Sequence, residues 1–260
     1  KGLLEGLNDP YSVYYTAEEY RKMMEQTSGT YSGIGALVSQ NAETGIITVV
    51  KAFADAPAAK AGVKNGDIIY KVKGKEVTGV DINNVVTEMK GEKGTTVDIT
   101  VYRESEKKYI DFTITRDQVN EPTVEYKMLD KKKKIGYIQI SQFEEVTYDQ
   151  FTKALDDLKK QGMKAVIFDV RSNPGGLYET VCKMLDEILP EGNLVSTKDK
   201  YGNEEKQTSD SKCLDMPMVV LQNKDSASAS EIFAGAIQDF NAGKIVGTQS
   251  FGKGIVQTIL

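Results

Sequence analysis

Residues 218–232 read Met-Val-Val-Leu-Gln-Asn-Lys-Asp-Ser-Ala-Ser-Ala-Ser-Glu-Ile, a pattern that predicts a strand, a polar turn and the start of a helix. The apolar run 218–221 predicts a buried strand, and apolar residues at helical spacing follow over 232–237. The polar, serine-rich turn between them therefore connects a strand to a helix. The first backbone N–H groups of a helix have no partner inside it, so hydroxyls in this turn would lie beside donors that can stabilise an oxyanion.

Three serines of this turn, Ser226, Ser228 and Ser230, are candidate nucleophiles, and the residues around them do not choose among the three. Ser228 together with Glu231 also fits a capping box, in which the serine does no more than begin the helix. The small alanines on both sides of Ser228 fit a hydroxyl that a bulky substrate must reach.

A second stretch, Ser-Phe-Gly-Lys-Gly-Ile-Val-Gln at 250–257, places a lysine between two glycines. The chain contains no histidine, which excludes Ser-His-Asp and Cys-His arrangements and any histidine-ligated metal. Lys253 is therefore the candidate base, although a solvated lysine is the ordinary alternative. A lysine acts as a base only when it is neutral, which burial or nearby positive charge favours. If 252–257 form a strand, the side chains of Lys253 and Gln257 share one face.

The bulk composition bounds the class of protein. At 260 residues the chain can form one large or two modest domains. The net charge is −5, without a basic face for nucleic acid, and we expect the four lysines at 131–134 to form a solvated turn. No run of ~18 apolar residues predicts a membrane span. The chain opens on Lys1 inside a helical pattern, so we expect that an upstream segment has been removed.

Cys182 and Cys213 are the two cysteines, thirty-one positions apart. In a domain of this size we expect two buried thiols, with a disulfide as the alternative.

The first thirty residues (1–30) predict a helical segment. A helix over 2–7 is broken at 8–12, since proline disfavours helical geometry in the residue before it. Thr16 and Glu19 fit a capping box that opens a second helix through Met24, and Gly29 ends it.

Residues 31–117 predict a small β-rich barrel or sandwich with one amphipathic helix at about 82–89. Alternating runs predict strands at 45–50, 67–72, 96–102 and 109–114. A glycine-flanked turn at Gly33, Ile34, Gly35 and Ala36 can aim consecutive N–H groups at one point, which suits a carboxylate. A tight turn without a ligand is the alternative.

Residues 118–134 read as a linker, and the chain then alternates strands with helices. The expected strands are 135–140, 165–170, 218–221 and 245–247, the expected helices 147–161, 178–189 and 231–240, and 195–212 reads as a polar loop. This alternation predicts an α/β layered domain over 118–260 with a largely parallel sheet, whose active groups gather at the C-terminal ends of the strands. The turn after the expected strand 165–170 contains a proline followed by Gly175 and Gly176. It either serves only to connect the strand to a helix or supplies a glycine N–H that stabilises an oxyanion.

Two resemblances follow from these segments. Residues 61–69, Ala-Gly-Val-Lys-Asn-Gly-Asp-Ile-Ile, together with the turn at 33–36 and the helix, closely resemble a PDZ domain. Four motifs in order resemble the C-terminal processing peptidases, also called tail-specific proteases: Leu-Asn-Asp-Pro-Tyr-Ser at 7–12, Arg-Ser-Asn-Pro-Gly-Gly at 171–176, Ser-Ala-Ser-Ala-Ser-Glu at 226–231, and the lysine motif at 250–257. The resemblance covers essentially the whole chain.

The resemblance implies a crotonase/ClpP-like protease core with an inserted PDZ domain and an N-terminal helical segment. It implies Ser228 as the nucleophile, Lys253 as the general base and Gln257 as the residue that positions the lysine. The implied oxyanion hole is the N–H of Gly175 or Gly176 with that of Ala229. The implied PDZ site receives a peptide C-terminus at Gly33, Ile34, Gly35 and Ala36.

The family further implies a serine endopeptidase that binds the C-terminus of protein or peptide substrates with apolar ends and cleaves through an acyl-enzyme. We expect no metal and no other cofactor, no nucleic acid partner, and an extracytoplasmic location in the bacterial periplasm or at the cell surface. Membrane association would come only through a missing N-terminal segment, and the oligomeric state stays open, a homo-oligomer included.

Such proteases continue beyond the lysine motif, so we expect that the C-terminal part of the core is missing after Leu260. The alternatives are a catalytically silent peptide-binding protein on the same fold and, less favoured, a crotonase-type acyl-CoA enzyme.

Overall fold

The computed structural model describes residues 2, 6, 9 and 12–257. They divide into two compact units, one of residues 30–121 and one that combines 1–29 with 122–260. The predicted helix over 2–7 and its break at 8–12 lie largely outside the described residues. No helix in the described part of the chain has both the length and the apolar character that crossing a bilayer requires.

Helix α2 (Ala17–Ser28) begins where the sequence predicts, and Gly29 is its C-cap. Thr16 and Glu19 form the capping box, with the Thr16 N–H donating to the Glu19 carboxylate at 2.8 Å. Gly29 ends the helix with a positive φ of 67°, a conformation that glycine adopts without a steric penalty. The helix is four residues longer than predicted, because nothing between Met24 and Gly29 interrupts it.

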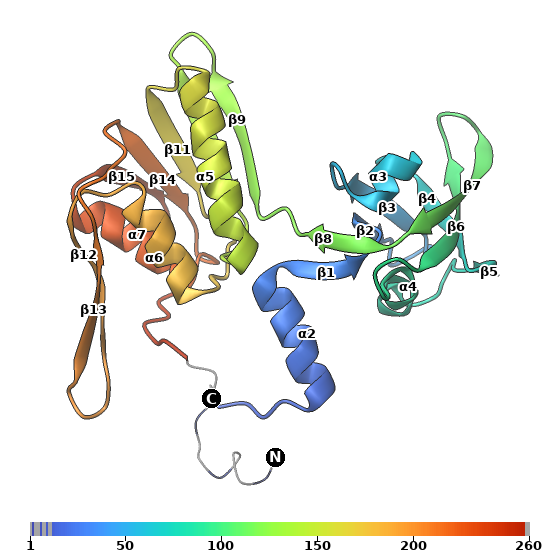
Figure 1. Cartoon of the computed structure of the whole chain (residues 1–260), viewed down its shortest axis with the longest axis horizontal. Coiled ribbons are helices and arrows are strands. Elements are labelled where there is room, and N and C mark those ends of the chain that lie inside the picture. Colours follow the sequence, from blue (N-terminus) through green and yellow to red (C-terminus); the bar gives the residue numbers. More distant parts are fainter. Residues whose placement is uncertain (1, 3–5, 7–8, 10–11, 258–260) are drawn as a thin grey trace. The chain divides into compact units, whose positions relative to one another are not determined.

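The unit of residues 30–121 is built on an antiparallel sheet with strand order β2-β3-β4-β6-β7, where β5 adds to β4 (Figure 1). Its strands are β2 (Ala36–Gln40), β3 (Ile47–Ala52), β4 (Ile68–Val72), β5 (Lys75–Glu76), β6 (Thr96–Arg103) and β7 (Lys108–Thr115). Helices α3 (Pro57–Ala61) and α4 (Ile82–Met89) accompany the sheet. The four predicted strands and the helix at 82–89 are confirmed, whereas β2, β5 and α3 were not predicted.

The first and last strands of this unit pair with each other in a separate two-stranded sheet. Strand β1 (Thr30–Gly33) pairs antiparallel with β8 (Asp117–Asn120). Because β8 belongs to this ladder, the compact unit extends to Glu121.

The second unit contains a five-stranded sheet of order β15-β14-β11-β10-β9. Strands β10 (Ile135–Ile140), β11 (Ala165–Asp169), β14 (Met218–Gln222) and β15 (Gly243–Gly247) are parallel, and β9 (Val124–Asp130) runs antiparallel to β10. Helices α5 (Glu145–Lys160), α6 (Tyr178–Asp186) and α7 (Ala229–Asp239) connect the parallel strands. The predicted α/β layers and the largely parallel sheet are therefore confirmed.

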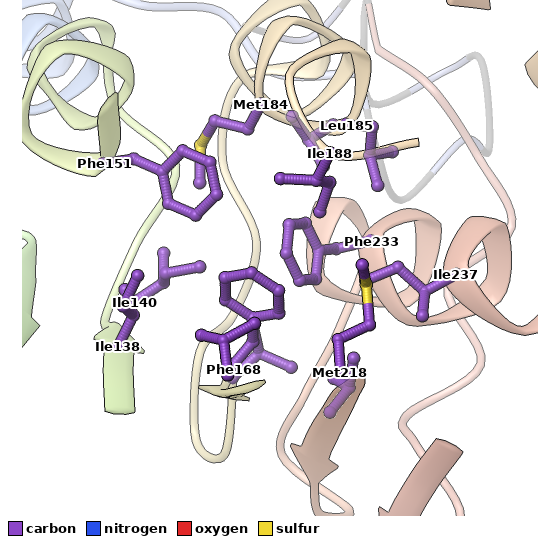
Figure 2. Close-up of a cluster of buried hydrophobic side chains, with 14 of the residues drawn as sticks. Ile138, Ile140, Phe151, Phe168, Met184, Leu185, Ile188, Met218, Phe233 and Ile237 are labelled. Carbon is purple, nitrogen blue, oxygen red and sulfur yellow. The ribbon is translucent and has the colours of Figure 1, made fainter. Parts of the chain in front are cut away.

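The core of this unit lies where the three helices pack against one face of the sheet. Figure 2 shows Phe151 of α5, Met184 of α6 and Phe233 of α7 pointing toward Ile138 and Phe168 of the strands. The Phe168 and Phe233 rings meet edge to face with centroids 5.4 Å apart. Such burial of large apolar side chains supplies most of the stability that holds the strand ends in place.

Three expectations about irregular segments are wrong. The linker at 118–134 contains β8 and β9, whose alternation is obscured because most β9 side chains are solvent-exposed. The polar loop at 195–212 contains most of a hairpin of β12 (Gly192–Lys198) and β13 (Glu204–Ser209). Leu194 of β12 is buried, but most other side chains of the hairpin are polar, so the sequence carries no periodic signal there. Residues 252–257 form no strand, since they pair with no neighbouring strand among the described residues.

Two further predictions concern the run of lysines and the two cysteines. The lysines at 131–134 form the turn between β9 and β10, as predicted. Cys182 and Cys213 are both free thiols; Cys182 is buried, but Cys213 is exposed.

Candidate functional site

Two chain crossovers meet at the C-terminal edge of the parallel sheet. The glycine turn, which we define as residues 170–177, follows β11 and leads into α6. Residues 223–228, which we call the nucleophile turn after the candidate nucleophile Ser228, follow β14 and lead into α7. Because β11 and β14 are neighbouring parallel strands, both turns leave the sheet at the same edge.

The structure separates the three serines that the sequence left equivalent. Ser226 is fully buried and its hydroxyl donates to the Val170 carbonyl at 2.7 Å. Ser230 is also fully buried, and its hydroxyl donates to the Asn173 carbonyl at 2.9 Å. Both hydroxyls therefore tie the nucleophile turn to the glycine turn, whereas Ser228 is partly exposed.

Ser228 occupies a backbone conformation that non-glycine residues seldom adopt, with φ 56° and ψ −115°. A non-glycine residue in this conformation has a strained backbone. Such strain persists only where the surrounding structure holds the residue in place, and it is often found at functional sites. Ala229 follows as the first residue of α7, and no described residue accepts a hydrogen bond from its N–H.

The glycine turn packs directly against Ser228, the candidate nucleophile. A Cβ atom on Gly175 would lie 2.8 Å from the Ser228 Cβ and 3.0 Å from the Ala229 nitrogen, so only glycine fits there. The Gly175 N–H donates to Asn173 Oδ1 at 2.8 Å. Gly176 is exposed and forms a parallel bridge with Phe143, which anchors the turn beside the end of β10.

The lysine segment, residues 250–257, has no regular secondary structure but is fastened to the nucleophile turn. The Phe251 N–H donates to the Ser226 carbonyl at 3.0 Å. The Gly252 and Lys253 N–H groups donate to the Glu231 carboxylate at 2.6 and 2.8 Å. At the other end of its side chain, Lys253 Nζ donates to Gln257 Oε1 at 3.0 Å. The expected neighbourhood of Lys253 and Gln257 is confirmed, although a strand does not create it.

Glu231 joins the two segments that carry the candidate nucleophile and base. Besides the two bonds from the lysine segment, it accepts the Ser228 N–H at 2.8 Å. Burial opposes ionisation of Glu231, but hydrogen bonds from Ser250 and from the three N–H groups outweigh it and hold the pKa of this carboxyl below its ordinary value. The local sequence pattern predicts Glu231 only as a helix-capping residue and gives no sign of its contact with the lysine segment.

Asp169, at the end of β11, is a buried carboxylate that sequence analysis did not single out. It receives a bidentate interaction from Arg171, at 2.6 Å to the nearest nitrogen, and a hydrogen bond from the Tyr137 hydroxyl at 2.7 Å. Burial raises the pKa of Asp169, but the bonds from Arg171 and Tyr137 outweigh that effect and lower it overall. An acid at the end of an apolar strand with an arginine two positions later is a signal that could have found this pair.

In the other unit, the turn at Gly33, Ile34, Gly35 and Ala36 precedes an edge strand of the sheet. The Ile34 and Gly35 carbonyls accept hydrogen bonds from Ala58 and Phe53 at 2.7 and 3.0 Å, which fixes the turn. Gly35 has a positive φ of 75°. Since β2 lies at the edge, one of its sides is open to pair with an added strand.

Comparisons with known proteins agree on both units. The family model for peptidase family S41 matches residues 134–260, and the model for the PDZ domain matches residues 32–114. The "Carboxy-terminal-processing protease" of Bartonella bacilliformis is 39% identical over 267 residues, which cover 100% of this chain and 60% of that protein. The "Probable CtpA-like serine protease" of Staphylococcus epidermidis is 38% identical over 262 residues, covering 99% and 52%.

Among solved structures, the photosystem II D1 C-terminal processing protease matches with a TM-score of 0.55 and 28% identity, covering 99% of this chain and 70% of that one. The chain thus spans about half the length of the curated relatives that it matches.

Proposed function

The chain belongs to peptidase family S41 and carries a PDZ domain, and from that premise we propose that it is a serine endopeptidase with Ser228 as nucleophile and Lys253 as general base. Its substrates would be proteins or peptides whose C-termini bind the PDZ domain. The wider resemblance to exported peptidases extends the proposal to an extracytoplasmic location.

The proposed reaction is acyl transfer through a covalent intermediate. Neutral Lys253 accepts the Ser228 hydroxyl proton while the serine oxygen attacks the peptide carbonyl, and the carbonyl electrons move onto oxygen. Backbone N–H groups stabilise that oxyanion, the amine leaves with a proton from Lys253, and water then hydrolyses the acyl-enzyme. Gln257 orients the lysine through the bond to Nζ.

One observation carries this assignment: of the three serines in the Ser-Ala-Ser-Ala-Ser motif, Ser226 and Ser230 are buried with their hydroxyls bonded to the glycine turn. Ser228 is the partly exposed one, has the strained backbone, and lies against Gly175. Its N–H also shares the Glu231 carboxylate with the N–H of Lys253. Nucleophile and base therefore belong to one hydrogen-bonded assembly.

For the PDZ domain, the proposal is that the N–H groups of Ile34, Gly35 and Ala36 bind a C-terminal carboxylate. The peptide would pair with the open side of β2, facing α4, and its apolar final side chain would be buried there. An amidated peptide, which lacks the carboxylate, should bind more weakly.

A serine-directed fluorophosphonate probe tests the catalytic part. We expect stoichiometric labelling of the wild type at Ser228, no labelling or cleavage in Ser228→Ala, and strongly reduced labelling in Lys253→Ala. Ser209→Ala is the matched control, because it removes a buried serine hydroxyl of β13, which bonds to the Pro190 carbonyl outside both turns, and it should keep labelling at Ser228. A folded wild type that binds peptides through its PDZ domain but does not label would instead support a catalytically silent binding protein.

A further inference from the structure

Asn173 is a buried asparagine of the glycine turn, and both its side-chain nitrogen and its side-chain oxygen form hydrogen bonds. It has no exposed surface. Its Nδ2 donates to the Ile140 carbonyl at the end of β10 at 2.9 Å, and its Oδ1 accepts the Gly175 N–H at 2.8 Å. These two bonds need one donor and one acceptor, so a carboxamide fits and a carboxylate of the same shape does not.

The backbone carbonyl of Asn173 reaches the other turn. It accepts hydrogen bonds from the Ala227 N–H at 3.0 Å and from the Ser230 hydroxyl at 2.9 Å. Both donors flank Ser228 in sequence. Asn173 therefore connects three segments, namely the end of β10, the glycine turn and the nucleophile turn.

These bonds also decide which glycine amide is left for a ligand. Gly175 is buried and its N–H is engaged by Asn173. Gly176 is exposed and sits in a parallel bridge in which the flanking groups, the Gly175 carbonyl and the Leu177 N–H, bond to Phe143 at 2.9 and 2.6 Å. The Gly176 N–H itself points away from Phe143, and no described residue accepts a hydrogen bond from it.

We propose that Asn173 is the positioning residue of the oxyanion hole, and that by binding the Gly175 amide it leaves the Gly176 and Ala229 amides as the donors. This inference rests on the proposed peptidase function and chooses between the two glycines that the motif alone leaves open. Asn173 does not touch the substrate in this scheme. It acts by fixing the spacing of the two turns from which the donors come.

The test compares Asn173→Asp and Asn173→Ala with the wild type on a peptide substrate. The aspartate keeps the volume but cannot donate to Ile140, and the alanine releases the Gly175 amide. Loss of one oxyanion donor costs roughly 100-fold in kcat. We expect a fall of about that size in both variants, with KM changed less than about threefold.

A peptide boronate forms a tetrahedral adduct with a serine, so its binding affinity reports on the oxyanion hole. A purely structural role of Asn173 would not change this affinity selectively. If Asn173 acts through the oxyanion hole, boronate affinity should fall in proportion to kcat/KM while substrate KM stays nearly constant. A folded Asn173→Asp with wild-type kcat, or a lowered kcat with unchanged boronate affinity, overturns the inference.

Ser209→Ala is the control for lost stability. Ser209 is also buried, and its hydroxyl donates to the Pro190 and Gly192 carbonyls beside the β12–β13 hairpin, outside both turns. The change should lower the melting temperature and leave kcat unchanged. Equal kcat losses in Ser209→Ala and Asn173→Ala at equal loss of stability would contradict the proposal.

Two further measurements cover the cases in which the Asn173 variants do not fold or the wild type shows no activity. If neither Asn173 variant folds, Ser230→Ala decides, since it removes one bond to the Asn173 carbonyl without burying a charge; an unchanged kcat would reject the inference. If the wild type neither cleaves peptides nor reacts with the boronate, the proposed function fails. Amide hydrogen exchange then decides the positioning role, because Asn173→Ala should accelerate exchange at Gly175 and Ala227 and Ser209→Ala should not.

Discussion

Glu231 Oε2 accepts a hydrogen bond from the Lys253 N–H at 2.8 Å, and the same oxygen accepts the Ser228 N–H at 2.8 Å. A residue that caps α7 thereby also fixes the segment that carries the candidate base. The lysine segment has no strand partner among the described residues, so this carboxylate and the Phe251–Ser226 backbone bond fasten its first half.

Glu231→Gln should lower activity more than it lowers stability. The glutamine side chain presents only one good acceptor to three N–H donors, so the lysine segment loses a fixed position relative to Ser228. We expect kcat to fall about tenfold or more, in line with the cost of misplacing a catalytic group. The free energy of unfolding should fall by about 1–2 kcal/mol, the usual cost of losing a cap. Steady-state kinetics and urea unfolding measure both.

Glu19→Gln is the matched control for that experiment. Glu19 forms the same kind of capping box with Thr16 at the start of α2. This change should weaken α2 and leave kcat as in the wild type. A similar loss of kcat in both variants would contradict a specific role for Glu231.

The stabilising effect of Glu231 should depend on pH in one direction. Its pKa is lower in the folded protein than its ordinary value, so its contribution is fully present above about 4.5 and is lost as the pH falls through the folded-state pKa. The difference in melting temperature between the wild type and Glu231→Gln should therefore be constant near neutral pH and shrink below about pH 4.5. A difference that grows toward acidic pH would contradict this assignment.

Much of the fold could be predicted because the elements that pack against a core have apolar residues that recur at helix or strand spacing. The strand at 135–140 and the helix at 82–89 match the structure, since their apolar residues face one core. The hairpin of β12 and β13 escaped prediction because almost none of its side chains is buried, and backbone pairing leaves no trace in a polar sequence.

The candidate site could be predicted only in part, for a related reason. The residues that do the proposed chemistry lie in motifs, so Ser228 and Lys253 stood out. The residues that hold them, Asn173 and Glu231, act through bonds between segments more than 20 positions apart in the sequence. Glu231 looked like an ordinary helix cap, because the local half of its role is one.

Gly175→Ala should abolish activity while Gly162→Ala should not. Both glycines have positive φ, 107° and 82°, so each alanine pays about 1 kcal/mol of backbone strain. Only at Gly175 would the new methyl group meet the Ser228 Cβ and the Ala229 nitrogen, at 2.8 and 3.0 Å; at Gly162 the nearest atom is 3.9 Å away. Comparing kcat at matched melting temperature separates displacement of Ser228, the proposed nucleophile, from backbone strain.

Asp169 and Tyr137 should be coupled energetically, because they share one hydrogen bond beneath the glycine turn. Tyr137→Phe should cost about 1 kcal/mol, the net value of a typical hydrogen bond. Asp169→Asn should cost about 1–2 kcal/mol, less than breaking a fully buried ion pair, because the Arg171 side chain is 54% exposed and water can solvate it. Urea unfolding of both single variants and the double variant gives the coupling energy, and we expect the double variant to lose less than the sum. Strict additivity would mean that the Tyr137 hydroxyl does not stabilise the Asp169 carboxylate.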